Sequence, residues 1–311
     1  MAKTNNSSAI AVVGAMNMDL SVTTNELPKK GESVLGSTIL QSAGGKGANQ
    51  AVAAALVGGN VTLISMRGDD LYGEQLVDAA TEVGVCMELV GIDASEKTGT
   101  AVIAVDSHGD NMIVISPGAN SLITPEIAEE GLRAIANLAV VSICGEVPLS
   151  TIKASLITAQ EIGATSVLNL SPYNPDAISL LPLASVLVVN QHEAADITGI
   201  ADPLADWLAT TEAFKKVGSQ TVVVTLGEDG ATILDCIDEN FVPTKVDAIK
   251  VKAVDTTGCG DAFTGSLCVE LAAGAPMVDA VKFAVKVAGV AATSSGAQKS
   301  YRAREHVLSV A

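Results

Sequence analysis

The chain has 311 residues, of which 48% are hydrophobic and only 3% are aromatic, so aliphatic side chains must build its core. Its formal net charge of −17 disfavours a nucleic-acid partner, because such a partner requires a basic surface. No apolar run is long enough to span a bilayer, residues 1–8 lack the apolar segment of a signal peptide, and the five scattered cysteines form no CxxC pair. These features predict a cytoplasmic protein that binds neither membranes nor nucleic acid.

Short β-branched segments alternate with longer alanine-rich segments along the chain. The strand candidates are mostly continuous apolar runs, which are typical of strands buried on both faces of a parallel sheet: residues 10–15, 60–66, 139–144, 165–170, 185–190 and 221–226. The helix candidates are residues 47–57, 73–83, 125–137, 149–162, 203–217, 261–273 and 278–292. This alternation predicts one α/β domain over residues 1–311, with a three-layer α/β/α core around a mostly parallel sheet.

Two segments, residues 19–40 and 98–116, have strand character but contain no helix. In the second, residues 100–105 and 111–115 flank a turn sequence at 106–109, which predicts a hairpin. In the first, we expect two strands on either side of residues 27–31. The four strands are expected to be antiparallel and to form a small β-lid, made by about residues 17–43 and 98–117, inserted into the core. Because the hairpin is apolar on both faces, we expect substrate and core to cover one face and a second subunit the other.

The most informative run, Asp-Thr-Thr-Gly-Cys-Gly-Asp-Ala-Phe-Thr-Gly, begins at Asp255. A strand-like segment, residues 250–254, precedes it, and an apolar segment that predicts a helix follows it. Gly258 and Gly260 would lie at the helix start, where unpaired N–H groups and the positive end of the dipole attract anions. Asp261 adds a negative charge there. Its carboxylate makes sense if it removes a proton from a nucleophile that attacks a phosphate.

Polar clusters follow two other predicted elements, where open α/β sheets bind ligands. Asn17 and Asp19 would share one face of an extended chain and suit neighbouring hydroxyls, although a polar loop is the commoner use of such a pair. Residues 44–51, Gly-Gly-Lys-Gly-Ala-Asn-Gln-Ala, begin a helix but match neither a P-loop nor a dinucleotide fingerprint. A tight turn between lid and core explains these glycines as well as a ligand does.

Three further acidic or glycine-rich positions also follow predicted strands. The carboxylate of Glu193, three residues after Asn190, suits Mg²⁺ held through water, whereas a helix N-cap with its capping-box Glu is the commoner explanation. Residues 225–230 predict a turn between two apolar strands, which would border a nucleotide or serve only as a hairpin turn. Glu146 ends an apolar strand and would either bind a ligand or anchor a helix start.

In their order along the chain, these clusters resemble the PfkB carbohydrate kinases over essentially the whole length. Residues 44–51 and 255–263 match the two signatures of that family, and the second signature is highly specific. The resemblance implies an ATP-dependent sugar kinase with Asp261 as general base and the backbone from Gly258 to Asp261 as anion hole. Within the family, the pairing of Asn17-Met18-Asp19 with residues 44–51 favours phosphorylation of D-ribose at its 5-hydroxyl, giving ribose 5-phosphate.

The resemblance also implies the residues that bind each ligand. The sugar would contact Asn17, Met18, Asp19, Gly45, Lys46, Gly47, Asn49, Glu146 and Asp261. ATP would contact Asn190, Thr225, Leu226, Gly227, Glu228, Asp229, Gly230 and Gly260. Glu193 would help to place Mg²⁺, and a K⁺ site would use Asp255, Thr257, Ala291, Ser294, Gly296 and Ser300, mostly through backbone carbonyls. A homodimer formed through the lids is expected.

Three positions depart from the family pattern. Cys259 stands where the family usually has Ala, and its oxidation or alkylation would block the anion hole. Lys299 stands where Pro is frequent, which loosens the expected cation loop. Val285, near the expected adenine pocket, is apolar where some relatives are polar.

Other functions remain open from the sequence. Within the family, the acceptor could be deoxyribose, fructose, a nucleoside or a keto acid, although the predicted lid contains no aromatic residue to stack on a nucleobase. A non-catalytic sugar sensor is a further alternative, against which the intact Asp261 and its glycines argue. A dehydrogenase is disfavoured because no dinucleotide fingerprint follows the first strand.

Overall fold

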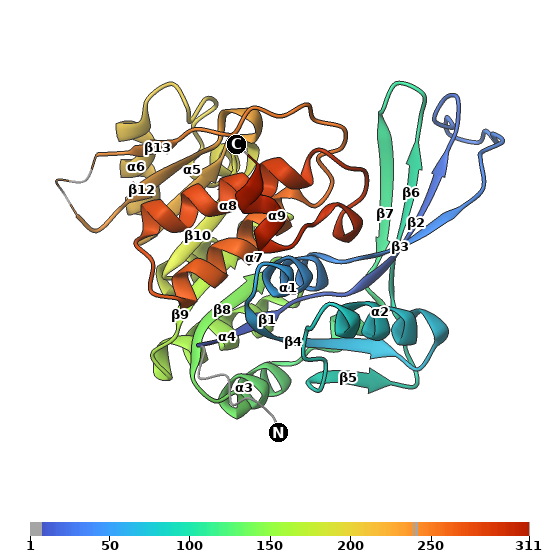
Figure 1. The fold of residues 1–311 in the computed structure, drawn as a ribbon, viewed down its shortest axis with the longest axis horizontal. Coiled ribbons are helices and arrows are strands. Elements are labelled where there is room, and N and C mark those ends of the chain that lie inside the picture. The colour runs from blue at the N-terminus through green and yellow to red at the C-terminus, as the bar shows by residue number, and fades with distance from the viewer. Residues whose placement is uncertain (1–7, 239, 241, 311) are drawn as a thin grey trace.

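The computed structural model describes residues 8–238, 240 and 242–310, and within them a nine-stranded sheet forms the centre of the molecule (Figure 1). The N-terminal segment considered for a signal peptide lies, except for Ser8, outside these residues. The strand order is β13-β12-β11-β10-β9-β8-β1-β4-β5. Their bounds are β1 (Ala9–Val13), β4 (Asn60–Gly68), β5 (Val90–Asp93), β8 (Leu138–Cys144), β9 (Thr165–Asn169), β10 (Val186–Asn190), β11 (Thr221–Thr225), β12 (Ala231–Asp235) and β13 (Thr244–Val246). The strands from β11 through β10, β9, β8, β1 and β4 to β5 all pair in parallel. Strands β12 and β13 are added to the β11 edge in antiparallel orientation.

Helices cover both faces of this sheet, which confirms the three-layer core. One face packs against α1 (Lys46–Leu56), α2 (Leu71–Glu82), α7 (Cys259–Ala272), α8 (Met277–Ala291) and the C-terminal α9 (Arg304–Ser309). The other packs against α3 (Pro125–Ala134), α4 (Leu149–Glu161), α5 (Gln191–Thr198) and α6 (Trp207–Lys216). Side chains of β1 alternate between the two layers, with Ile10 and Val12 in one and Ala11 and Val13 in the other. None of the described helices is long and apolar enough to cross a membrane.

A second sheet of four strands extends beyond the core (Figure 1), in the order β3-β2-β6-β7. Its strands are β2 (Asn17–Thr23), β3 (Leu40–Gly44), β6 (Gly99–Val105) and β7 (Asn111–Ser116). The pairs β2–β3 and β6–β7 are antiparallel, but the central pair β2–β6 is parallel, so the expectation of four antiparallel strands is wrong for this pair. The reason is that β2 and β6 follow β1 and β5, which run in the same direction in the core.

Other boundaries also differ from the prediction. Residues 250–254 form no strand; within the described chain their only backbone partner is the carbonyl of Ala292, which accepts from Val254 N. Helix α6 begins at Trp207 rather than at residue 203, because Oδ1 of Asp206 accepts the N–H groups of Leu208 and Ala209. The helix candidates did not include α5, although a capping box at its start was considered, or α9, and the edge strands β5 and β13 were not predicted. Short 3₁₀ turns complete the chain: η1 (Gly118–Leu122), η2 (Pro175–Leu183), η3 (Gly227–Asp229) and η4 (Gln298–Ser300).

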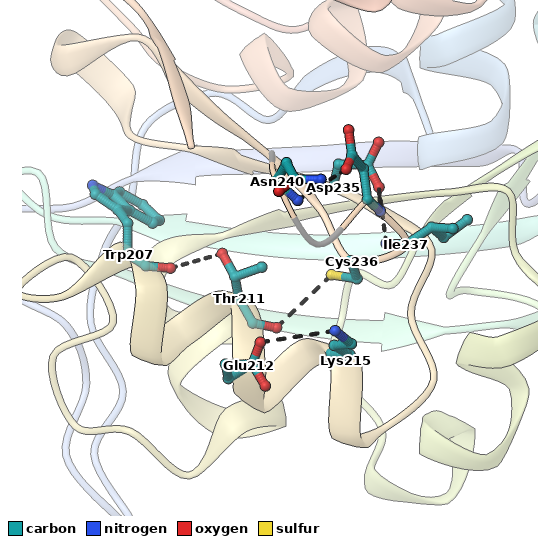
Figure 2. A network of polar contacts seen from close by, with 9 residues as sticks. Trp207, Thr211, Glu212, Lys215, Asp235, Cys236, Ile237 and Asn240 are labelled. Carbon is teal, nitrogen blue, oxygen red and sulfur yellow. Dashed lines mark hydrogen bonds and ion pairs between the residues drawn. The ribbon is translucent and has the colours of Figure 1, made fainter. Parts of the chain in front are cut away.

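At the end of β12, polar contacts join the antiparallel edge of the sheet to helix α6 (Figure 2). The thiol of Cys236 lies 3.9 Å from the carbonyl oxygen of Thr211 on α6, and Oδ1 of Asp235 accepts the N–H groups of Ile237 and Asp238. The aspartate therefore turns the chain directly after the strand. This edge matters for the site because β13 leads into residues 247–251 and 253, which line the larger cavity described below.

Candidate active site

The predicted catalytic and sugar-binding residues meet at the carboxyl ends of the parallel strands. Asn49 on α1 donates from Nδ2 to Oδ2 of Asp261 on α7 at 2.9 Å. The backbone N–H of Lys46 donates to Oε2 of Glu146, which follows β8, at 2.8 Å. Gly45 has no capping side chain, so Glu146 serves as the cap of α1 from another element. Four predicted positions from three distant segments of the sequence therefore lie in one cluster.

Asp261 lies in the first turn of α7 and is only 6% exposed. Burial raises the pKa of its carboxyl group, while the charge of Lys46 and the amides of Asn49 and Gln50 lower it. The amide contact from Gln50, at 3.3 Å to Oδ1, was not predicted. The carboxylate is thus shielded from water yet supplied with hydrogen-bond donors.

The glycines before Asp261 leave the start of α7 open. Gly258 has a φ of 75°, and an added Cβ would lie 2.6 Å from the hydroxyl oxygen of Tyr301, which itself donates to the Gly258 carbonyl at 2.9 Å. An added Cβ at Gly260 would meet no atom within 4 Å, and Gly260 lines the larger cavity. The N–H of Cys259 donates to the carbonyl of Thr256, but those of Gly258, Gly260 and Asp261 have no acceptor among the described residues and can therefore reach an anion in that cavity.

Strand β2 of the second sheet contributes Asn17 and Asp19 to the same cluster. Oδ1 of Asn17 accepts from Nδ2 of Asn120 at 2.8 Å, and Asn120 also bonds both backbone polar groups of Met16. Asn120 was not predicted, because the residues around it, Pro-Gly-Ala-Asn at 117–120, look like an ordinary turn in the sequence. Burial, followed by the charges of Glu146 and Asp261, raises the pKa of Asp19 to about 6. A Cβ at Gly44 would overlap the Asp19 carboxylate, so the pairing of β3 with β2 requires glycine at this position.

Met18 lies on the opposite face of β2 from Asn17 and Asp19, as strand alternation requires. It is buried in the core and lines a separate cavity of about 410 Å³ together with Val52 and Leu76. Only the backbone of Met18 is available to the face of β2 that carries the side chains of Asn17 and Asp19. The glycines Gly45 and Gly47 act by close packing: a Cβ on either would lie within 2.7 Å of the backbone of residues 14–16.

Lys46 places a positive charge among these acids. Among the described residues, no carboxylate pairs with its ammonium within 4.0 Å. Burial lowers the pKa of Lys46, but the charges of Asp261 and Glu146 outweigh burial and hold the pKa above its ordinary value. Lys46 is therefore a protonated cation that is free to bind an anionic group.

A cavity of about 720 Å³ lies on the other side of Gly260, large enough for a nucleotide. The predicted turn supplies Thr225, Gly227, Glu228, Asp229 and Gly230 to its wall, whereas Leu226 packs toward the core. The opposite wall consists of residues 247–251 and 253 with Phe263, Val285, Ala288, Gly289 and Ala292. Apart from Val285, and Phe263 at the end of the signature 255–263, this wall was not predicted, because its residues lie on segments without a glycine signature; most are apolar, whereas Asp247 and Lys250 are charged.

Cys259 also lines this cavity, at the first position of α7. Burial raises the pKa of its thiol to about 11, with smaller contributions from Asp255 and Asp261. At neutral pH the group is therefore a protonated thiol, which reacts more slowly than a free cysteine side chain.

Asn190 and Glu193 form a capping box at the start of α5. Oδ1 of Asn190 accepts from the N–H groups of His192 and Glu193, and Oε2 of Glu193 accepts the N–H of Asn190 at 2.8 Å. The capping explanation is therefore confirmed. Glu193 also faces the cluster, since its charge contributes to the raised pKa of Lys46. Its second carboxylate oxygen suits Mg²⁺ held through water, which is the ligand chemistry that this ion prefers.

Asp255 joins the two loops of the predicted cation site. Its Oδ1 accepts from Thr257 N at 2.9 Å and its Oδ2 from Gly296 N at 2.8 Å. Burial raises the pKa of Asp255, but these hydrogen bonds outweigh it and hold the pKa below its ordinary value. An ionised carboxylate between two loops fits a monovalent cation. Within the described chain, no three His, Cys, Asp or Glu residues gather closely enough for a dedicated divalent metal site.

A carboxylate at a helix start, between a polar cluster and a nucleotide-sized cavity, places the protein in the class of phosphoryl-transfer enzymes. The sequence pattern of the pfkB family of carbohydrate kinases matches residues 7–304, and the chain belongs to this family.

Individual relatives are similar over nearly their whole length. The chain is 34% identical over 298 residues to the ribokinase of Bacillus subtilis, covering 96% of this chain and 97% of that protein. It is 31% identical to the deoxyribokinase of Salmonella typhi, covering 94% of this chain and 95% of that one. The solved structure of Arabidopsis thaliana ribokinase complexed with ribose and ATP matches with a TM-score of 0.87 at 28% identity, over 97% of this chain and 98% of that one.

Proposed function

We propose that this protein transfers the γ-phosphoryl group of ATP to the 5-hydroxyl of D-ribose, giving ribose 5-phosphate and ADP. The observation that carries the proposal is the position of Asp261. Its carboxylate bonds the sugar-side Asn49, while Gly260, the residue before it, lines the nucleotide-sized cavity. The similarity to ribokinases supports the choice of ribose.

Asp261 acts as the general base in this mechanism. It accepts the proton of the 5-hydroxyl as the sugar oxygen bonds to the γ-phosphorus and the bond to the bridging oxygen of ADP breaks. A carboxylate suffices because the hydroxyl becomes acidic as it bonds to phosphorus. Asn17, Asp19, Asn49 and Glu146 orient the sugar hydroxyls, and burial of these groups strengthens each hydrogen bond.

Lys46 and the backbone of Gly258–Asp261 stabilise the charge on the moving phosphoryl group. Both are present before substrate arrives, so little reorganisation is needed in the transition state. Thr225, the turn Gly227–Gly230 and the facing apolar wall hold the nucleotide, and Asn190 contacts its phosphates through the Nδ2 group that capping leaves free.

Mg²⁺ and K⁺ complete the proposed site. Mg²⁺ neutralises phosphate charge when it binds with ATP, and Glu193 would hold its water ligands. The loops of Asp255, Thr257, Ala291, Ser294, Gly296 and Ser300 would hold K⁺, which orders the start of α7. Because ATP is an intracellular substrate, the proposed location is the cytoplasm.

We propose further that residues 17–43 and 98–117 act as a lid, and that two lids meet in a homodimer. Edge strand β7 is exposed over its whole length, and Ile113, Val114 and Ile115 are 52%, 66% and 50% exposed. An apolar edge of this kind needs a partner in solution.

Light scattering tests the dimer. It should give twice the mass of the 31.4 kDa chain at micromolar concentration, and Val114→Glu should reduce the measured mass to that of one chain. A monomeric wild type refutes the dimer.

A substrate panel tests the proposed reaction. Purified protein with ATP, Mg²⁺ and K⁺ is offered D-ribose, 2-deoxy-D-ribose, D-fructose and adenosine, and ADP release and the phosphorylated product are measured. We expect the highest kcat/KM for D-ribose. A higher kcat/KM for deoxyribose would overturn the proposal and favour the activity of the Salmonella typhi relative. Replacing K⁺ with Na⁺ tests the cation site.

A further inference from the structure

A second amide reaches the carboxylate of Asp261 from inside the core. Gln50 lies on α1 with 0% exposure, and its Nε2 donates to Oδ1 of Asp261 at 3.3 Å. Asn49, the preceding residue, donates to the other oxygen, Oδ2, at 2.9 Å. Each carboxylate oxygen therefore has its own amide donor. Asn49 lies at the sugar-facing side, whereas Gln50 has no surface with which to bind a ligand.

Hydrogen bonds on the far side of Gln50 fix the direction of its amide. Its Oε1 lies 2.8 Å from the hydroxyl of Ser142 and 3.3 Å from the thiol of Cys144, and both groups donate to it. Its Nε2 also donates to Oδ1 of Asn169 at 3.1 Å. Reversing the amide would place Oε1 against the oxygens of Asp261 and Asn169 with no proton between them. The NH₂ group must therefore face Asp261.

The sheet holds this network in place. Ser142 and Cys144 belong to β8, and Asn169 is the last residue of β9. Nδ2 of Asn169 donates to the carbonyl of Val188 on β10 at 3.1 Å, which fixes the Asn169 amide in turn. Three neighbouring strands thus set the orientation of a side chain on a helix. A buried polar network whose members all have partners is rigid.

Gly265 allows α7 to come close enough for the contact. It lies one turn after Asp261, and a Cβ there would overlap the carbonyl oxygen of Gln50. Helices α1 and α7 lie against each other (Figure 1), so the two side chains meet only because this position has no side chain.

We propose that Gln50 is a positioning residue for the general base. It holds the Asp261 carboxylate in one orientation and favours its ionised form, which leaves a lone pair on each oxygen for the acceptor hydroxyl. This inference rests on the proposed function of Asp261. It assigns a role in the reaction to a residue that contacts neither sugar nor nucleotide.

The charged and titratable groups around Asp261 differ in whether they favour its ionised form, and this makes the hydrogen bond from Gln50 important. Lys46 from α1 favours the carboxylate. Asp19 from β2 and Glu146 after β8 oppose it by like charge, and burial raises the pKa of Asp261 as well. The remaining titratable neighbours are Cys144, Cys259 and Tyr301, whose own pKa values burial raises above their ordinary values. Gln50 is thus one of three groups, with Lys46 and Asn49, that favour the anion.

The variant Gln50→Met tests the proposal, because it keeps similar volume and removes the donor. We expect kcat to fall about tenfold or more and KM for ribose to stay within about twofold, because the sugar ligands remain. The acidic limb of the kcat profile should move up by about one pH unit. In the ribose-free protein, carboxyl-carbon NMR, assigned with Asp261→Asn, should show the same upward shift in the pKa of Asp261.

Two further variants keep the test decisive. Leu156→Ala creates a cavity in α4, in the opposite layer, and should lower stability without moving either pH profile. Gln50→Glu keeps an acceptor for Ser142 and Cys144 but sets a second carboxyl group beside Asp261, which should raise the upper apparent pKa of the pair. If Gln50→Met does not fold, Gln50→Glu decides.

An unchanged Asp261 pKa and kcat in a folded Gln50 variant would overturn the inference. Failure of the proposed function has a different signature, since the wild type would then not phosphorylate ribose. The NMR titration needs no turnover, so it reports on Gln50 in either case.

Discussion

The two sides of Asp261 offer different chemistry to the proposed ligands. On the proposed sugar side, buried charged and amide side chains from β2, α1 and the end of β8 lie together in a polar cluster. On the proposed nucleotide side, a cavity of about 720 Å³ is lined largely by apolar side chains and glycines, and the charged side chains that line it are exposed. A missing hydrogen bond leaves buried polar groups unpaired on the first side, whereas on the second it costs only contact area. The comparison therefore predicts strict choice of sugar and tolerant choice of nucleotide.

Asp261→Asn should have the largest effect, because it removes the base that serves both sides. We expect kcat to fall by about 10²–10⁴-fold. Ribose binding, measured by calorimetry, should persist, because Asp19, Asn49 and Glu146 remain. A wild-type rate in this variant would show that the assigned mechanism is wrong.

Asp19→Asn should separate function from stability on the sugar side. Loss of a charge-assisted hydrogen bond should raise KM for ribose about ten- to a hundredfold. The folded-state pKa of about 6 exceeds the ordinary value of 3.8, so the wild type loses stability as pH rises between these values. The variant does not ionise. We therefore expect it to be more stable at pH 7, on the order of 1–2 kcal/mol, with the difference vanishing near pH 4.

Thermal unfolding at several pH values measures the stability part of this prediction. A variant that is less stable than the wild type at pH 7 would show that the charge of Asp19 is compensated in the folded protein. Unchanged KM for ribose would remove Asp19 from the sugar-binding group.

Val285→Ala should have the smallest effect, because it only shortens one apolar side chain that lines the larger cavity. Loss of two methyl groups from the nucleotide cavity should raise KM for ATP about three- to tenfold and leave KM for ribose unchanged. Val281→Ala is the matched control: it lies one turn earlier on α8 and is buried, but it does not line the cavity. Equal effects from both variants would mean that helix stability, not nucleotide contact, is responsible.

The sequence predicted the residues of the proposed active site better than the residues that hold them in place. Glycine and acidic residues in the two signature runs and after β8 are local signals, and the structure brings Lys46, Glu146 and Asp261 of these segments together, although their roles stay predictions. Asn120 and Gln50 act through partners about a hundred residues away or more, such as Asn17 and Asp261, so no local pattern reveals them. The apolar wall around Val285 looks like ordinary core in the sequence.

In the fold, too, features with a local sequence signal were predicted, and features that depend on distant segments were not. Apolar runs predicted the parallel strands, because burial on both faces leaves a signature in each strand alone. The parallel pairing of β2 with β6 depends instead on where β1 and β5 lie in the core, which is a property of the assembled sheet. Residues 250–254 have strand composition, yet without a neighbouring strand they form a cavity wall.

All four strands of the second sheet join the core at the same end. Asn17 begins β2 opposite Gly44, the last residue of β3, and Gly99, the first of β6, while Thr100 pairs with Ser116 at the end of β7. Movement of the proposed lid would therefore bend all of these attachments together. Asn17 and Asp19 lie next to the attachments, so they would move little while the far ends of the strands move a long way. Under the proposed function, the residues that bind the sugar would thus be in position before the lid closes.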